Sequence, residues 1–239
     1  MADLGWRSGY YALAMVPLVG AVLTAALLPS RHAVGTQKSA VQAQAPGENW
    51  IRSPVFWMLA GTFAMMSLSF MGLLPHFVPM LGDAGMDPRA AGKLAGQIGI
   101  AVIASRMLVG LALDRFFAPR IAIAISLVAA AGNLVFYFLG AEYAWLTAIA
   151  IGLALGAELD LMGFLIARYF GLARFGKIYG WLYFAFIFAS GLGPLWVGAV
   201  RDATGDYSIA LVASAIGLLV SCGGFLVMPR YPDPALQQR

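Results

Sequence analysis

The sequence predicts an all-α integral membrane protein with about seven transmembrane helices. Hydrophobic residues make up 61% of the 239 residues and charged residues only 11%, and the mean hydropathy is +0.82. Because average soluble chains are about 25% charged, most of this surface must face lipid. The chain also contains about seven apolar runs near the ~20 residues that a membrane-spanning helix needs.

These runs follow one another through short connections, with one polar interruption. Their approximate bounds are Gly9–Leu28, Val55–Val78, Ala90–Leu113, Ile121–Gly140, Ala144–Ile166, Ile178–Val200 and Ser208–Met228. Residues 29–53 are polar and contain Pro and Gly, which indicates a linker without a core of its own. We therefore expect a first helix in residues 1–28, a cytoplasmic linker in 29–53, a six-helix bundle in 54–229 and a cytoplasmic tail in 230–239.

The distribution of basic residues predicts the orientation in the membrane. If the N-terminus is outside, ten Lys and Arg residues lie in inside segments and four in outside segments, as the positive-inside rule requires. The inside set is Arg31, Lys38, Arg52, Arg115, Arg120, Arg168, Arg174, Lys177, Arg230 and Arg239, and the outside set is Arg7, Arg89, Lys93 and Arg201. These residues do not cluster, so the net charge of +4 gives no support for nucleic-acid binding.

Three charged residues inside the apolar runs are the candidate substrate-binding residues: Arg106, Glu158 and Asp160. A charge near the membrane centre costs roughly 2.5–3.5 kcal/mol, so such residues normally face a cavity or a partner. The two acids are two positions apart and point roughly 200° apart on a helix. We therefore expect one of them to face the transport pathway or Arg106, and the other to bond within the bundle.

Two interpretations of these charges are open. In the functional one, Arg106 binds the carboxylate of an anionic substrate, because a guanidinium grips a carboxylate in a bidentate fork, and an acid carries a coupling proton. In the structural one, the charges form an ion pair that only locks helices together.

The sequence contains no constellation typical of an enzyme. It has no zinc-protease, nucleophile-elbow or phosphate-loop motif, and Cys222 is its single cysteine. We therefore expect no catalytic residue, no metal and no cofactor. A cluster of small residues with a proline, Gly191, Gly193 and Pro194, indicates close helix packing or a flexing helix. His76 near a helix end is interpreted as a solvated polar residue.

Several segments resemble the major facilitator superfamily of transporters. Gly110 followed by Asp114 and Arg115 resembles its loop signature, at the place between helices eight and nine. The segments Glu158–Leu161, Arg168–Gly171 and Phe175–Gly180 resemble the helix 10–11 region of monocarboxylate porters and oxalate/formate antiporters. Further similarity follows in Ser190–Pro194 and Asp202–Gly205, and Gly5–Arg7 resembles the start of helix six.

The resemblance implies that the chain corresponds to helices six to twelve, the C-terminal half of such a transporter. Members of this kind move small organic anions, often with protons, by rocking two six-helix halves around a central site. Arg106 stands where a helix-eight arginine can bind the substrate carboxylate. Val102 stands where monocarboxylate porters have an acid, so proton coupling would use Glu158 or Asp160.

The expected partners are therefore a small anionic substrate, the lipid bilayer, and a separate N-terminal half or a second copy of the chain. We expect the protein in the inner (plasma) membrane of a bacterium, with its N-terminus outside and its C-terminus in the cytoplasm. The alternative is a non-transporting remnant, or a subunit that needs a separate N-terminal half.

Overall fold

The computed structural model describes residues 5–27 and 50–232, and this part of the chain is helical with no β-strand. The helices are α1 (Gly5–Leu27), α2 (Pro54–Leu73), α3 (Phe77–Asp83), α4 (Pro88–Leu113), α5 (Ala118–Leu139), α6 (Ala144–Phe170), α7 (Phe175–Thr204) and α8 (Ser208–Leu226). Two single 3₁₀ turns, η1 (Trp50–Arg52) and η2 (Ala141–Tyr143), precede α2 and α6. The chain divides into two units, Met1–Pro46 and Gly47–Arg239.

Six helices of the second unit, α2 and α4 to α8, are long and apolar enough to cross a membrane. The protein is therefore an all-α, multi-pass integral membrane protein, as predicted. In the first unit, α1 is apolar over Leu13–Leu27 and contains Pro17. The predicted linker spans residues 29–53 and the predicted tail spans residues 230–239. Residues 28–49 and 233–239 lie outside the described residues, so the structure describes little of either segment.

The structure corrects one predicted helix. The second apolar run, Val55–Val78, was expected to be continuous, but it is split into α2 and α3 at Leu74–His76. Pro75 has no amide hydrogen to donate to the preceding turn. The Phe77 amide instead donates to the Leu74 carbonyl at 3.2 Å, and the chain restarts as α3.

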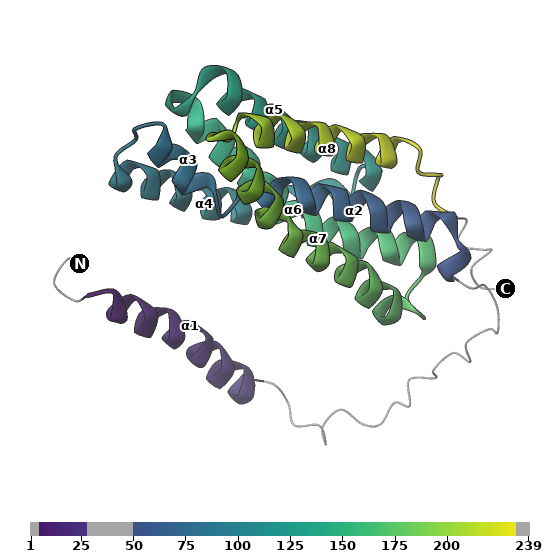
Figure 1. Cartoon of the computed structure of the whole chain (residues 1–239). Helices are drawn as coiled ribbons and strands as arrows, with labels where there is room; N and C mark the ends of the chain where they lie inside the picture. The colour runs from purple at the N-terminus through teal and green to yellow at the C-terminus, as the bar shows by residue number, and fades with distance from the viewer. Residues whose placement is uncertain (1–4, 28–49, 233–239) are drawn as a thin grey trace. The chain divides into compact units, whose positions relative to one another are not determined.

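The helices of the second unit pack in the order α4, α6, α5, α8, α2, α7 (Figure 1). The most extensive contacts join α4 to α6 and α2 to α7, while α5 and α8 pack against each other between these pairs. Only 22% of the α4 span and 17% of the α7 span are buried, against 61% of the α6 span. The outer surfaces of α4 and α7 are therefore the least covered part of the bundle.

Small residues allow α2 and α7 to approach closely where they cross. A Cβ added at Gly193 would lie 2.7 Å from the Gly72 nitrogen and 2.8 Å from its Cα. Two side chains add bonds across the same contact: Ser67 Oγ donates to the Phe186 carbonyl at 3.1 Å, and Trp196 Nε1 donates to the Leu68 carbonyl at 3.4 Å. Gly193 therefore serves close helix packing, whereas a Cβ at Gly191 would meet nothing within 4 Å.

This contact gives the first prediction. Gly193→Ala places a methyl group against the Gly72 backbone, so we expect it to destabilise the chain by about 1–3 kcal/mol, as overpacking does. The matched change Gly191→Ala adds the same atom in open space, where it should be neutral or stabilise by up to ~1 kcal/mol because Ala favours the helix over Gly. Thermal unfolding of both variants in detergent checks this, and equal shifts for the two would contradict the close contact.

Candidate functional site

The crossing of α4 and α6 positions the two helices that hold the candidate residues. A Cβ added at Gly156 of α6 would lie 2.5 Å from the Val102 carbonyl oxygen and 2.6 Å from the Ser105 Cβ, so only glycine permits this approach. At the same level, Ser105 Oγ donates a hydrogen bond of 2.7 Å to the Leu153 carbonyl. The relative position of α4 and α6 is therefore fixed within one turn of Arg106 and Glu158.

Arg106 and Glu158 lie on the neighbouring helices α4 and α6, close to the tight contact between them. Arg106 follows Ser105 and is exposed on α4, whereas Glu158 is only 3% exposed. The Glu158 Oε2 atom has no hydrogen-bond partner in the part of the chain that the structure describes. No salt bridge joins Arg106 to Glu158. Among the described residues, the salt bridge is between Arg201 and Asp83. The predicted meeting of Arg106 with one acid stays a prediction, because the structure places the two residues on neighbouring helices without a salt bridge between them.

Asp160 points to a different neighbour. It is half-buried and interacts electrostatically with Tyr179 of α7. Tyr179 belongs to a row of stacked rings along α7, with centroid distances of 5.5 Å from Phe175 to Tyr179, 5.8 Å from Tyr179 to Tyr183 and 6.1 Å from Tyr183 to Phe186. The two acids differ in their surroundings, since Glu158 is buried and Asp160 is only half-buried.

The predicted loop residues lie near the end of α4. Gly110, Asp114 and Arg115 are all exposed, and the Arg115 amide donates to the Ala112 carbonyl at 3.0 Å, which begins the turn into α5. A Cβ at Gly110 would meet nothing within 4 Å. These residues lie on an uncovered surface, and the side chains of Asp114 and Arg115 form no hydrogen bond or salt bridge with another described residue.

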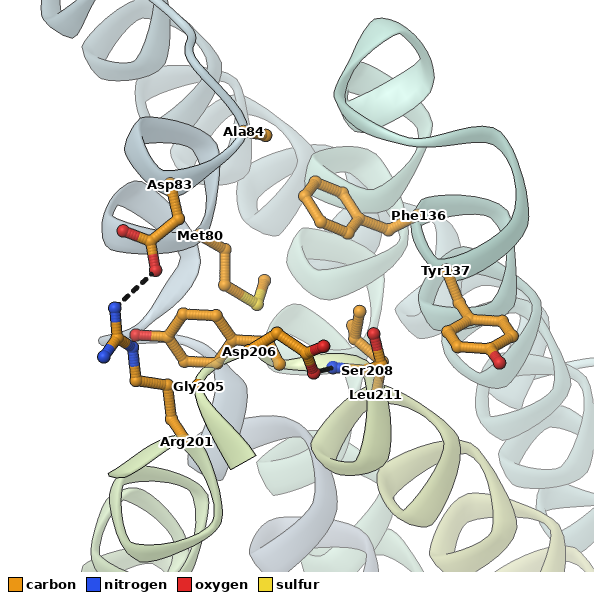
Figure 2. A pocket seen from close by; sticks show the side chains of 11 residues that line it. Met80, Asp83, Ala84, Phe136, Tyr137, Arg201, Gly205, Asp206, Ser208 and Leu211 are labelled. Atoms are coloured by element: carbon orange, nitrogen blue, oxygen red, sulfur yellow. Dashed lines mark hydrogen bonds and ion pairs between the residues drawn. The ribbon is translucent and has the colours of Figure 1, made fainter. Parts of the chain in front are cut away.

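A cavity of about 420 Å³ lies where α3, α5, α7 and α8 meet (Figure 2). Its charged lining residues are engaged within the chain. Arg201 donates to Asp83 at 3.0 Å, and Asp206 Oδ1 accepts from the Ser208 amide at 2.8 Å at the start of α8. None of Arg106, Glu158 or Asp160 lines this cavity, so the charged pair of α4 and α6 is a separate site.

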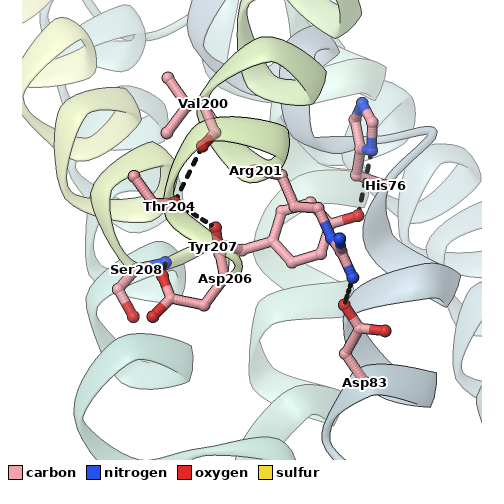
Figure 3. Close-up of polar contacts among 8 residues, drawn as sticks. All are labelled: His76, Asp83, Val200, Arg201, Thr204, Asp206, Tyr207 and Ser208. Atoms are coloured by element: carbon pink, nitrogen blue, oxygen red, sulfur yellow. Dashed lines mark hydrogen bonds and ion pairs between the residues drawn. The ribbon is translucent and has the colours of Figure 1, made fainter.

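A polar network beside this cavity was missed by the sequence analysis (Figure 3). His76 Nε2 lies 3.2 Å from the Pro194 carbonyl and Nδ1 lies 3.3 Å from Tyr207 Oη. A carbonyl oxygen only accepts, so Nε2 carries the hydrogen of the bond to Pro194. The expectation that His76 is solvated is wrong, since it is half-buried and joins the α2–α3 break to Pro194 in α7.

Comparison with known proteins gives a family and a fold. A family model described as Major Facilitator Superfamily matches residues 1–194. No curated protein matches the chain, while 27 chains of solved structures do. One is the in meso crystal structure of the POT family transporter PepTSo, with a TM-score of 0.63 and 20% sequence identity. The match covers 75% of this chain and 39% of that transporter, so the chain spans well under half of its length.

The His76 network gives the second prediction. His76→Ala leaves the Pro194 carbonyl and the Tyr207 hydroxyl without their partner, so we expect a loss of about 1–3 kcal/mol of stability. We also expect faster backbone hydrogen exchange in residues 194–208, measured by mass spectrometry. The control Asp83→Asn breaks a pair whose side chains are 38% and 46% exposed, and its effect should be much smaller. Similar exchange in the two variants would refute a structural role for His76.

Proposed function

Since the chain belongs to the Major Facilitator Superfamily, we propose that it forms the C-terminal half of a secondary transporter for small organic anions such as monocarboxylates. The observation that carries this proposal is the placement of exposed Arg106 on α4 and buried Glu158 on α6, both within one turn of the tight α4–α6 contact. Charges inside membrane spans are costly, and they usually mark a substrate or ion pathway.

Arg106 is the proposed substrate-binding group. Its guanidinium can bind a carboxylate through two parallel hydrogen bonds, which supplies both affinity and orientation. It is exposed on α4, so an anion can reach it without displacing a salt bridge. The exposed apolar side chains Ile103 and Met107 flank it and suit the short hydrocarbon part of a monocarboxylate.

Glu158 is the proposed proton-coupling group. One guanidinium can balance one carboxylate, so an ionised Glu158 competes with the substrate carboxylate for Arg106. Protonation of Glu158 removes this competition and links anion binding to uptake of a proton. Asp160 is the second acid of the proposed pathway, and its neighbour Tyr179 offers a hydroxyl that can exchange hydrogen bonds with it or with the substrate.

Alternating access needs two halves that face each other around a central site. The uncovered surfaces of α4 and α7 are the proposed contact for the other half, which is either an N-terminal half or a second copy of this chain. Exposed apolar residues on both helices support this, among them Leu111 of α4 and Phe184 and Leu195 of α7. The loop residues Gly110, Asp114 and Arg115, and the segment Gly191–Pro194 of α7, are proposed to act in the change of conformation.

The proposed orientation has the N-terminus outside and the C-terminus in the cytoplasm of a bacterial cell, because the α4–α5 and α6–α7 loops and the end of α8 are rich in Arg and Lys.

This orientation gives the third prediction. Ala84 in the α3–α4 loop and Ala173 in the α6–α7 loop are both exposed, at opposite ends of the bundle. We expect a membrane-impermeant maleimide to label Ala84→Cys in intact cells, and to label Ala173→Cys only after permeabilisation. The native Cys222 is buried and serves as the background control. The reverse pattern would overturn the orientation.

The fourth prediction tests the substrate site. Arg106→Gln should weaken binding of radiolabelled lactate or pyruvate to the full chain by about 10–100-fold, because a charge-assisted hydrogen bond is worth roughly 1.5–3 kcal/mol. Arg106→Lys should retain part of the affinity, and Arg89→Gln, which removes an exposed arginine at the other end of α4, should have no effect. Unchanged binding in Arg106→Gln would contradict the site.

Uptake into proteoliposomes separates transport from binding. The proposal expects uptake that an inward-directed proton gradient stimulates, and expects Glu158→Gln to lose this stimulation. Binding without uptake by the chain alone, restored on co-expression of an N-terminal half, would indicate a subunit. Neither binding nor uptake across a panel of monocarboxylates would favour the non-transporting alternative.

A further inference from the structure

The bundle contains a second cavity, at the end opposite the His76 network. It has a volume of about 630 Å³ and lies between the start of α5 and the end of α8. Two arginines line it, Arg120 in the first turn of α5 and Arg230 after α8. The other lining residues are apolar or aromatic: Phe117, Pro119, Ile123, Phe225, Leu226 and Tyr231.

Among the described residues, the charge that lines this cavity is positive. No acidic side chain is among its lining residues, and neither arginine forms a salt bridge with another described residue. The positive N-terminus of α5 and the negative C-terminus of α8 both lie here, so the two helix dipoles offset each other. The two guanidinium groups therefore set the sign of the site.

The segment that holds Arg230 is anchored on both sides. The Ala118 amide donates to Tyr231 Oη at 3.0 Å, and Tyr169 Oη donates to the Pro229 carbonyl at 2.6 Å. The Tyr231 ring lies 4.7 Å from Phe117 and 5.2 Å from Tyr169, measured between centroids. Because these bonds fix the backbone before and after Arg230, the cavity is built into the fold.

Tyr231 adds no negative charge to the site. Burial raises the pKa of its phenol above the ordinary value, although the amide of Ala118 and the charge of Arg168 act in the opposite direction. The hydroxyl therefore stays protonated at neutral pH. A third cation is also near, because the guanidinium of Arg168 lies 5.8 Å from the centroid of the Tyr231 ring.

The position and lining of the cavity suit a ligand with an anionic headgroup and an apolar chain. It lies at the ends of two helices that are long and apolar enough to cross a membrane, at the level expected for lipid headgroups, and Leu226 in its wall is 70% exposed. We propose that this cavity binds an anionic phospholipid, with the headgroup phosphate between Arg120 and Arg230 and an acyl chain along Ile123 and Leu226. In the proposed orientation this is the cytoplasmic leaflet, where basic pockets between helices bind anionic headgroups.

The lipid serves a purpose distinct from substrate transport. Arg120 belongs to α5 and Arg230 follows α8, so one phosphate between them neutralises their mutual repulsion and joins the two helices at this end. The site shares no residue with the substrate site proposed around Arg106, and its test needs no transport activity.

The experiment is native mass spectrometry of the full chain, released from detergent in the presence of phosphatidylglycerol or phosphatidylcholine. We expect phosphatidylglycerol to bind more tightly. Replacing one arginine, Arg120→Gln or Arg230→Gln, should weaken its binding about fivefold, and the double variant about thirtyfold. The matched control is Arg52→Gln with Lys177→Gln, which removes two exposed cations at the same end outside the cavity and should bind like the wild type.

Two further measurements are needed. One distinguishes binding of a lipid from binding of a free phosphate, and the other distinguishes binding in the cavity from binding to a charged surface. Ile123→Trp fills the apolar wall and leaves both arginines, so it should weaken phosphatidylglycerol binding, while glycerol 3-phosphate should not displace the lipid. Equal binding of the two lipids, or wild-type affinity in the double arginine variant, would overturn the proposal. Displacement by equimolar glycerol 3-phosphate would also overturn it and assign the site to a soluble phosphate. Gel filtration and thermal unfolding confirm that each variant is folded.

Discussion

The close approach of α4 and α6 is the constraint on which the charged site depends. Between helices in lipid there is little hydrophobic driving force, so small residues and interhelical hydrogen bonds must hold them together. Here Gly156 lies against the backbone of α4, and Ser105 donates to the Leu153 carbonyl. Arg106 is the next residue after Ser105, and Glu158 is two residues after Gly156. Their separation is therefore set by backbone packing, which leaves the charges available to interact with something else.

The α2–α7 pair uses the same means, with Gly72 against Gly193. The two tight pairs touch each other far less than they touch internally, and α5 and α8 close the bundle behind them. Asp160 and its neighbour Tyr179 lie at the junction of the pairs, one on α6 and the other on α7. A change in the angle between the pairs would therefore alter the surroundings of Asp160 more than those of Glu158, which lies two residues from Gly156 at the α4–α6 contact.

The sequence predicts the helices well because backbone groups in lipid have no water to bond with and must form hydrogen bonds within the helix. It also predicts that Glu158 and Asp160 face different ways, since helical geometry alone decides this. It could not predict contacts between distant segments. Asp83 and Arg201 are 118 positions apart, and nothing in the pattern around His76 indicates Tyr207 as its partner. For the same reason, the sequence does not indicate that Arg120 and Arg230 line one cavity. Pro75, in contrast, could have suggested the break between α2 and α3.

Charge balance relates the arrangement around Arg106 to the kind of transport proposed. Within a region of low dielectric, an unpaired charge is expensive, so the bound state should be close to neutral. In the proposed cycle, Glu158 of the empty site is ionised and Arg106 balances its charge. Adding a carboxylate leaves one negative charge in excess, and adding one proton to Glu158 restores neutrality. In the proposed mechanism, the stoichiometry is therefore one anion with one proton, which moves no net charge across the membrane. A carrier that used Arg106 alone would instead have to move a charge with every anion.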